Sequence, residues 1–380
     1  MTLLRAAIAW HVFQISGSAF DLGMIGLVQF VPALGLTLVG GAVADAYDRR
    51  RVILATQATA LVCSAVLFVT TQVGAASLPL LYGMVLLAAV ASAFESPSRA
   101  SLLPTLVARE HFPRVVTVAA TNQALAFMTG PVLGGFVIAA GGVGAAYGVH
   151  VLLIAGSLFG MAFLHSPRSP SPTRSVRWQA IREGLVFVRR QRVVLGCMTL
   201  DLFAVLFGGA TALLPIYANE ILHVGARGYG ILSASLEMGA LAMSLLLVLL
   251  PPIRRAGPAL LATVTLYGVA TIIFGLSRWF PLSVAAYMAA GMADQVSVVL
   301  RGTAIQLSTP DALRGRVSAV NMIFIGGSNQ LGAAESGFVA ALTSAPFAVV
   351  SGGIGCLLVV AIVALRIPAL RRYRTDMRVG

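Results

Sequence analysis

The chain has 380 residues, of which 58% are hydrophobic and only 10% are charged, and its mean hydropathy is +0.91. Soluble domains carry about a quarter charged residues, so this composition excludes a water-soluble protein. All 26 basic residues are arginines, and they give a net charge of +13. They lie almost entirely in short segments between apolar runs, which indicates loops at a membrane surface and not binding of nucleic acid.

Apolar runs recur along the whole chain, and a helix needs about 20 apolar residues to cross a bilayer. We therefore predict an all-α membrane protein with twelve transmembrane helices. Their expected limits are 3–16, 22–44, 52–72, 79–95, 115–139, 145–164, 193–219, 229–250, 258–277, 281–306, 317–343 and 346–366. The first run covers only roughly 21 Å of helix at 1.5 Å per residue, so we expect this helix to be truncated.

The arginines are divided unequally between the two sides that twelve spans define. Twenty-four fall on one side, Arg5 and Arg301 included, and only Arg227 and Arg278 fall on the other. By the positive-inside rule, the arginine-rich side is cytoplasmic. We therefore expect a multi-pass membrane protein with both termini in the cytoplasm.

A long polar stretch divides the spans six and six. It predicts an N-terminal half over 1–164, a cytoplasmic linker over 165–192, and a C-terminal half with a basic tail over 193–380. The stretch opens with serines and prolines at 166–172, and an amphipathic segment follows at 176–192, which is typical of a helix lying on the membrane surface. Both an ordinary linker and a regulatory role remain open for it.

The two halves are also related in sequence. A shift of 202 residues aligns Arg99 with Arg301 and Gly130 with Gly332. Duplicated halves in one membrane chain are the architecture of alternating-access transporters, in which one half rocks against the other around a central site.

The segment from Gly41 to Arg50, directly after the second apolar run, resembles the G-x-x-x-D-R-x-G-R-R signature of the major facilitator superfamily. Gly41, Asp45, Arg49 and Arg50 match, whereas Ala46 and Asp48 depart from it. An acid and arginines at a helix end form a breakable cytoplasmic gate between two halves. The alternative is simple anchoring of the loop by its arginines.

A second motif in the fifth run resembles the end of the antiporter signature G-P-x-x-G-G. It comprises Gly130, Pro131, Gly134 and Gly135. Glycines allow close helix contact and proline kinks a helix, so this segment is a candidate pivot. Ordinary packing of small residues is the alternative.

The second half resembles the enterobactin-exporter-like branch of drug:proton antiporters in this superfamily. The similar segments are 229–232, 293–299, 309–321 and 328–337. The resemblance implies the major facilitator fold, with two pseudo-symmetric six-helix halves, and a proton-driven exporter of the inner membrane.

Acidic residues inside apolar runs need compensation, because an ionised carboxylate costs roughly 2.5 to 3.5 kcal/mol there. Glu237, Asp294 and Glu335 each lie among small polar residues on one helical face, Glu335 together with Asn321 and Ser328. This pattern predicts helices lining an aqueous cavity, with these acids as proton carriers. Permanent pairing with arginine is the alternative.

The remaining polar residues receive weaker assignments. Gln14 and Asn122 are candidates for hydrogen bonds to the substrate, and Glu95 is expected to pair with Arg99 one turn later. Asp294 and Arg301 are about 10 Å apart along their helix, so a partner on another helix, or water, is expected for them. Asp201, near the cytoplasmic end of its run, is expected to be a surface residue or to pair with the linker.

We therefore expect a secondary transporter that exports a small amphipathic or siderophore-like molecule in exchange for protons, acting as a monomer in the bilayer. No cofactor, metal or nucleic acid is expected. A non-transporting sensor on the same scaffold is an alternative. An intramembrane enzyme is a further one, although no G-x-S-x-G, H-E-x-x-H or Walker pattern occurs.

Overall fold

The structure is a computed structural model that describes residues 1–380 except 109, 164–177, 252 and 375–380. The serine- and proline-rich start of the linker, Arg109 and the end of the basic tail therefore lie outside the described residues. All regular elements described are helices. Those of the first part of the chain are α1 (Thr2–Ser16), α2 (Ala19–Ala46), α3 (Arg49–Gln72), α4 (Leu78–Leu102), η1 (Leu103–Thr105) and α5 (Phe112–Phe163).

The amphipathic part of the linker forms α6 (Trp178–Arg190). The helices that follow are α7 (Arg192–Phe207), η2 (Ala210–Leu213), α8 (Leu214–Ile216), η3 (Tyr217–Ile221), α9 (Gly225–Leu249), α10 (Ala256–Leu276), α11 (Phe280–Leu307), η4 (Asp311–Leu313), α12 (Arg314–Leu342), α13 (Ala345–Arg366) and α14 (Pro368–Arg371). Within the described ranges, eight helical segments are long and apolar enough to cross a membrane.

Two stretches of the chain contain a break between helices. The runs 115–139 and 145–164 share the label α5, but they are two helices that meet at Gly142, where φ is 75° and ψ is 178°. A positive φ of this kind strains any residue with a side chain, and glycine adopts it freely. The run 193–219 is interrupted after α7, where Gly208 ends the helix and a 3₁₀ turn follows.

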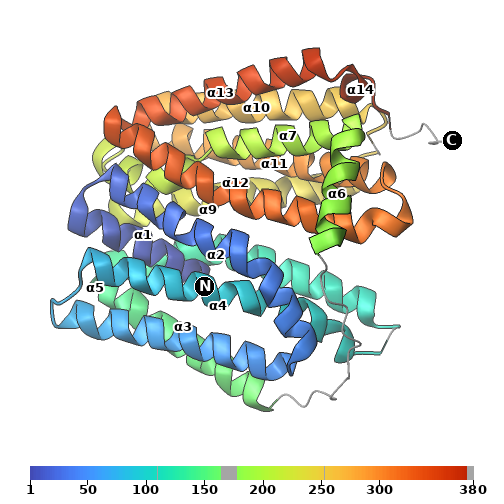
Figure 1. Cartoon of the computed structure of the whole chain (residues 1–380). Helices are drawn as coiled ribbons and strands as arrows, with labels where there is room; N and C mark the ends of the chain where they lie inside the picture. Colours follow the sequence, from blue (N-terminus) through green and yellow to red (C-terminus); the bar gives the residue numbers. More distant parts are fainter. Residues whose placement is uncertain (109, 164–177, 252, 375–380) are drawn as a thin grey trace.

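Figure 1 shows the helices running side by side in two groups. The first group, α1 to α5, fills the lower part of the view, and the second group, α7 to α14, fills the upper part. The groups meet where α2 packs against α12 and α5 packs against α9. Helix α6 lies across the end of the second group and packs on α7 and α12.

The two groups are packed together at one end of the helices only. One core cluster contains residues of both groups, among them Phe13 and Leu22 of the first and Tyr229 and Val349 of the second. These residues lie beside the turns α1–α2, η3–α9 and α12–α13. A second cluster belongs to the second group alone and lies at the opposite end, around α6 and α14.

Glycines set the close approach of the two groups at the packed end. A Cβ on Gly135 of α5 would lie 2.5 Å from the carbonyl oxygen of Ala226, and one on Gly230 of α9 would lie 2.7 Å from that of Pro131. A Cβ on Gly26 of α2 would lie 2.7 Å from the carbonyl oxygen of Gln330 on α12. Small residues of this kind let the backbones of membrane helices touch.

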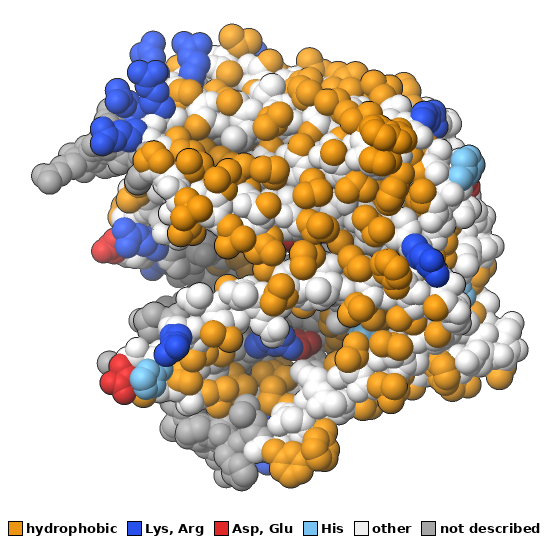
Figure 2. Space-filling model, turned by 180° about the vertical axis from the view of Figure 1, so that it is seen from behind, with side chains coloured by type: hydrophobic (Ala, Val, Ile, Leu, Met, Phe, Trp, Pro, Cys, Tyr) orange, Lys and Arg blue, Asp and Glu red, His pale blue; other side chains and the backbone are white. Residues whose placement is uncertain are grey.

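At the opposite end the groups diverge. Figure 2 shows a hollow between the upper and lower parts of the molecule, and it opens on the side where most of the arginine side chains gather. The structure is therefore closed at one end and open at the other, and the open end is the arginine-rich one.

Candidate functional site

A cavity of about 480 Å³ lies between the end of α11 and the start of α12, at the open end of the molecule. Its lining includes Gln306 and Thr309 from α11 and its C-terminal end, and Ser318 and Asn321 from α12. The side-chain oxygen of Asn321 is buried and has no hydrogen-bond partner among the described residues. A buried polar atom without a partner is costly, so this amide is available to a bound molecule.

A buried ion pair joins α7 to α11. The Nη1 atom of Arg301 lies 2.5 Å from Oδ1 of Asp201, and their side chains are only 7% and 4% exposed. The expectation that Asp201 is a surface residue is wrong, because the side chain turns into the second group of helices. Arg301 is likewise buried within α11 and is not a loop arginine.

Asp294 stands beside this pair. Asp201, Asp294 and Arg301 line one small cavity together with Tyr267 of α10 and Ser297 of α11. Two carboxylates therefore line one cavity with a single guanidinium within the membrane-spanning part of the protein, and Asp201 is the one that forms the ion pair. This arrangement holds one negative charge more than the arginine can neutralise, unless a proton is bound.

Glu237 belongs to the same region. It lies on α9, which packs closely on α11, because a Cβ on Gly291 of α11 would lie against the carbonyl oxygen of Leu236. Asp294 is near enough to act electrostatically on Glu237. The structure thus brings two of the three sequence-predicted acids together.

The third acid, Glu335, stands apart on α12. Its Oε2 accepts a hydrogen bond from Ser336 at 3.3 Å, and no described contact connects it to Glu237 or Asp294. Ser328, seven residues earlier, is buried, and its hydroxyl donates to the carbonyl oxygen of Ile325 in its own helix. The face of α12 therefore presents Asn321 and Glu335 but not the Ser328 hydroxyl.

The polar candidates of the first group are exposed. Gln14 lies near the end of α1, and Asn122 lies in the first part of α5. Glu95 and Arg99 form the expected pair within α4.

The arginines of the candidate gate bind carbonyl groups of their own group of helices. Arg49 donates to Ser101 at the end of α4 at 3.0 Å. Arg50 donates to Ala162 at the end of α5 at 2.5 Å. Asp48, where the signature has glycine, is the N-cap of α3 and accepts from the backbone N–H of Arg50 at 3.0 Å. Gly41 and Asp45 precede this cap within α2.

The candidate pivot lies where α5 touches its neighbours. Gly135 meets Gly230 of α9, as described above, and Gly130 meets Thr2 of α1 so closely that a Cβ would clash. Gly134 of α5 faces Leu3 of α1. Pro131 lies inside α5, between these contacts.

Sequence reasoning missed two charged groups. Asp201 was misplaced because its partner lies 100 residues away, and no local spacing signals it. Arg5 was counted among the arginines of the cytoplasmic side, although it is the fourth residue of an apolar helix and lines a cavity between helices. A lone arginine in an apolar run was the available signal.

Comparison with known proteins agrees with this architecture. The model of the family described as transmembrane secretion effector matches residues 2–378. The enterobactin exporter EntS of Escherichia coli O1:K1 is 26% identical over 373 residues, which are 98% of this chain and 89% of the exporter. The same protein of Escherichia fergusonii matches equally well.

Solved structures show the same fold. A peptide transporter in complex with alafosfalin superimposes with a TM-score of 0.74 at 11% identity, over 98% of this chain and 92% of that one. A bacterial homologue of the lysosomal transporter Spinster gives 0.72 at 13% identity, over 98% and 94%. The chain is therefore a multi-pass membrane transporter that belongs to the transmembrane secretion effector family of the major facilitator superfamily.

Proposed function

We propose that this protein exports a small amphipathic molecule across the inner membrane in exchange for protons, by alternating access between two six-helix halves. The observation that carries the proposal is the hollow between the two groups of helices, which is closed by glycine contacts at one end and open at the other. In this proposal α5 supplies two of the twelve spans, on either side of Gly142. The halves are 1–164 and 193–380, joined by the linker 165–192.

The arginine-rich end is the cytoplasmic one in this proposal, and the C-terminus lies there. The chain starts at mid-depth in the bundle, where α1 begins, and the start of α1 is turned toward that end. The structure then represents the state that is open to the cytoplasm and ready to load substrate. The gate at Gly41, Asp45, Arg49 and Arg50 would close in the opposite state, while the contact of Gly130, Pro131, Gly134 and Gly135 with α1 and α9 acts as the pivot. No partner subunit is required, so we propose a monomer.

The proton route runs through the second group of helices. Asp294 lines the same cavity as the Asp201–Arg301 pair, and Glu237 is near Asp294, so a proton that binds here removes an excess negative charge. Glu335 is a further carrier on α12. Asn321, Ser328, Asn122 and Gln14 are the candidates for substrate hydrogen bonds, and Asn321 is supported best because its buried oxygen has no described partner.

The similarity to the enterobactin exporter favours a siderophore-like substrate. Family membership excludes the intramembrane enzyme. A sensor on the same scaffold would bind ligand without net flux.

The test uses inside-out vesicles energised by a proton gradient. We expect these vesicles to accumulate labelled enterobactin or another compound from a panel of amphipathic molecules, and an uncoupler should abolish this accumulation. Glu237→Gln, Asp294→Asn and Glu335→Gln should each abolish coupled uptake while the protein still inserts. Glu220→Gln is the matched control, because Glu220 is exposed in η3, outside the cluster.

Full uncoupler-sensitive uptake by all three single variants would refute the role of these acids. Binding without any flux, for every compound that binds, would favour the sensor.

A further inference from the structure

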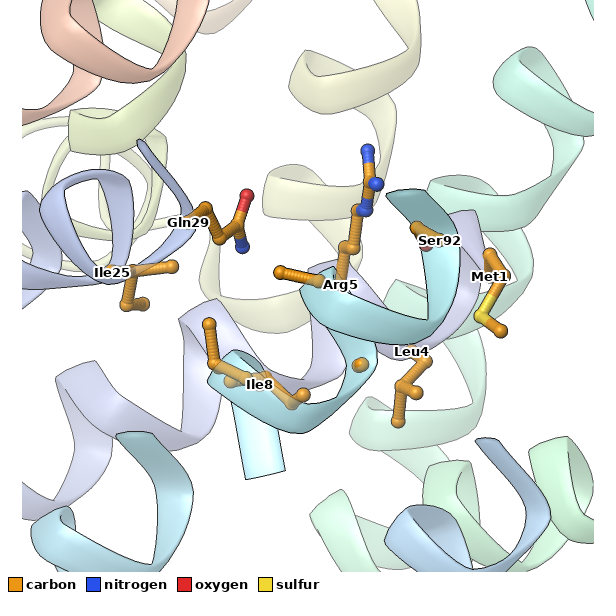
Figure 3. A pocket seen from close by; sticks show the side chains of 10 residues that line it. Met1, Leu4, Arg5, Ile8, Ile25, Gln29 and Ser92 are labelled. Atoms are coloured by element: carbon orange, nitrogen blue, oxygen red, sulfur yellow. The ribbon is translucent and has the colours of Figure 1, made fainter. Parts of the chain in front are cut away.

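A cavity surrounds Arg5 in the first group of helices, apart from the acidic cluster of the second group. Figure 3 shows Arg5 extending from α1, with Gln29 of α2 on one side and Ser92 of α4 on the other. Apolar side chains complete the lining; they are Met1, Leu4, Ile8, Ile25, Val85, Ala88 and Ala89. The cavity measures about 40 Å³, which accommodates one small polar group and not a whole amphipathic molecule.

This cavity lies at mid-depth in the bundle. Gln29 is the eleventh of the 28 residues of α2, and Ser92 is the fifteenth of the 25 residues of α4. Thr2 of α1 donates to the carbonyl oxygen of Ala126, which lies midway along the segment of α5 before Gly142. Transporters with duplicated halves bind their substrates near the bilayer midplane, so this depth is that of a substrate site.

Arg5 has no anionic partner among the side chains that the structure describes. The nearest acid along α4, Glu95, is already paired with Arg99. Asp21 of α2 accepts a hydrogen bond from Tyr82 at 2.8 Å. The Arg5 side chain is exposed and lines the cavity. An arginine inside the membrane-spanning part of a protein is costly without compensation, and such residues mark substrate or ion pathways.

We propose that Arg5 binds the anionic group of the transported molecule, so that the substrate is an amphipathic anion. Its guanidinium offers paired N–H donors that match a carboxylate or another flat oxyanion. Gln29 and Ser92 supply further hydrogen bonds, and the apolar lining contacts the neighbouring hydrocarbon part. This inference rests on the proposed transport function and adds the chemical class of the substrate.

The test measures equilibrium binding to the full chain in nanodiscs of zwitterionic lipid, with tritiated 2-naphthoate as the probe. Its uncharged isostere, 2-naphthamide, serves as the competitor. We expect saturable binding of the naphthoate, and competition by the amide that is about tenfold weaker or more, because a hydrogen bond to a charged group is worth about that factor.

Arg5→Gln should weaken naphthoate binding by about tenfold or more and leave the affinity for the amide unchanged, while Arg5→Lys should retain part of the preference for the anion. Arg278→Gln, at an exposed arginine between α10 and α11, is the matched control and should behave as the unaltered protein does. The inference is overturned if Arg5→Gln keeps the preference, or if the unaltered protein shows none.

Protection from chemical modification gives a second measurement that needs no folded variant. Phenylglyoxal modifies accessible arginines, and mass spectrometry of the Arg5 peptide reports the extent. Naphthoate should protect this peptide and naphthamide should not; equal modification in both samples contradicts the inference.

These measurements use no proton gradient. Loss of the preference for anions, together with intact uncoupler-sensitive flux of other compounds, refutes the anion site alone. Anion binding in a protein without such flux refutes the transport proposal alone.

Discussion

The buried pair between Asp201 and Arg301 allows a sharp prediction about stability. Asp201→Asn keeps the size of the side chain and creates no cavity, but it leaves the Arg301 guanidinium without its carboxylate partner. Breaking a buried pair in this way costs about 3–5 kcal/mol. Asp294 lines the same cavity and offers a second carboxylate, so we expect a loss near the lower limit, about 3 kcal/mol.

A double-mutant cycle separates two contributions to this loss: the interaction energy of Asp201 with Arg301, and the cost of leaving the charge of Arg301 buried and unpaired. Combining Asp201→Asn with Arg301→Gln removes both charges, so this double variant should be more stable than Asp201→Asn alone. The free energy of unfolding is measured by titrating SDS into mixed micelles. Asp294→Asn on the Asp201→Asn background should lower stability further, because it removes the substitute partner.

The reasoning is refuted by either of two results. One is an Asp201→Asn protein whose unfolding free energy equals that of the unaltered chain. The other is a double variant whose loss equals the sum of the single losses, because additivity means that the two side chains do not interact.

Other contacts yield further predictions. Gly135→Val should abolish transport, because even the Cβ of the new side chain would lie 2.5 Å from a carbonyl oxygen of α9. Gly156→Val should transport normally in the same vesicle assay, because a Cβ at Gly156 meets open space. Tyr229→Phe removes the hydrogen bond to the carbonyl oxygen of Ala6, 3.2 Å away, and should cost about 1 kcal/mol in the SDS titration; an unchanged midpoint would contradict this. Glu183→Gln breaks the ion pair with Arg316, whose side chains are 42% and 41% exposed, and should cost less than about 1 kcal/mol, with the difference vanishing at high salt.

The helices were largely predictable from the sequence, because each apolar run is long enough to be recognised without knowledge of its neighbours. The run at 229–250, for example, corresponds to α9 (Gly225–Leu249). The turn inside α5 was harder to anticipate in detail, since Gly142 reverses the chain without leaving a polar loop.

The charged site was predictable only in part. Asp294 and Glu237 stood out as acids in apolar runs. The distance along α11 left either another helix or water as the partner of Arg301, and the partner is Asp201 of α7. The identity of that partner depends on which face of α7 turns toward α11, and local periodicity carries no such information. For Arg5, the deciding fact was the depth of α1 relative to α2 and α4, which only packing reveals.

The one-sided closure of the two groups has a pharmacological consequence. Because the hollow opens only at the arginine-rich end, a compound that wedges the groups apart there would hold the protein in this state and stop its cycle. In the proposed orientation such an inhibitor would have to enter the cell first, and it would not act on the transporter when supplied from outside the cell.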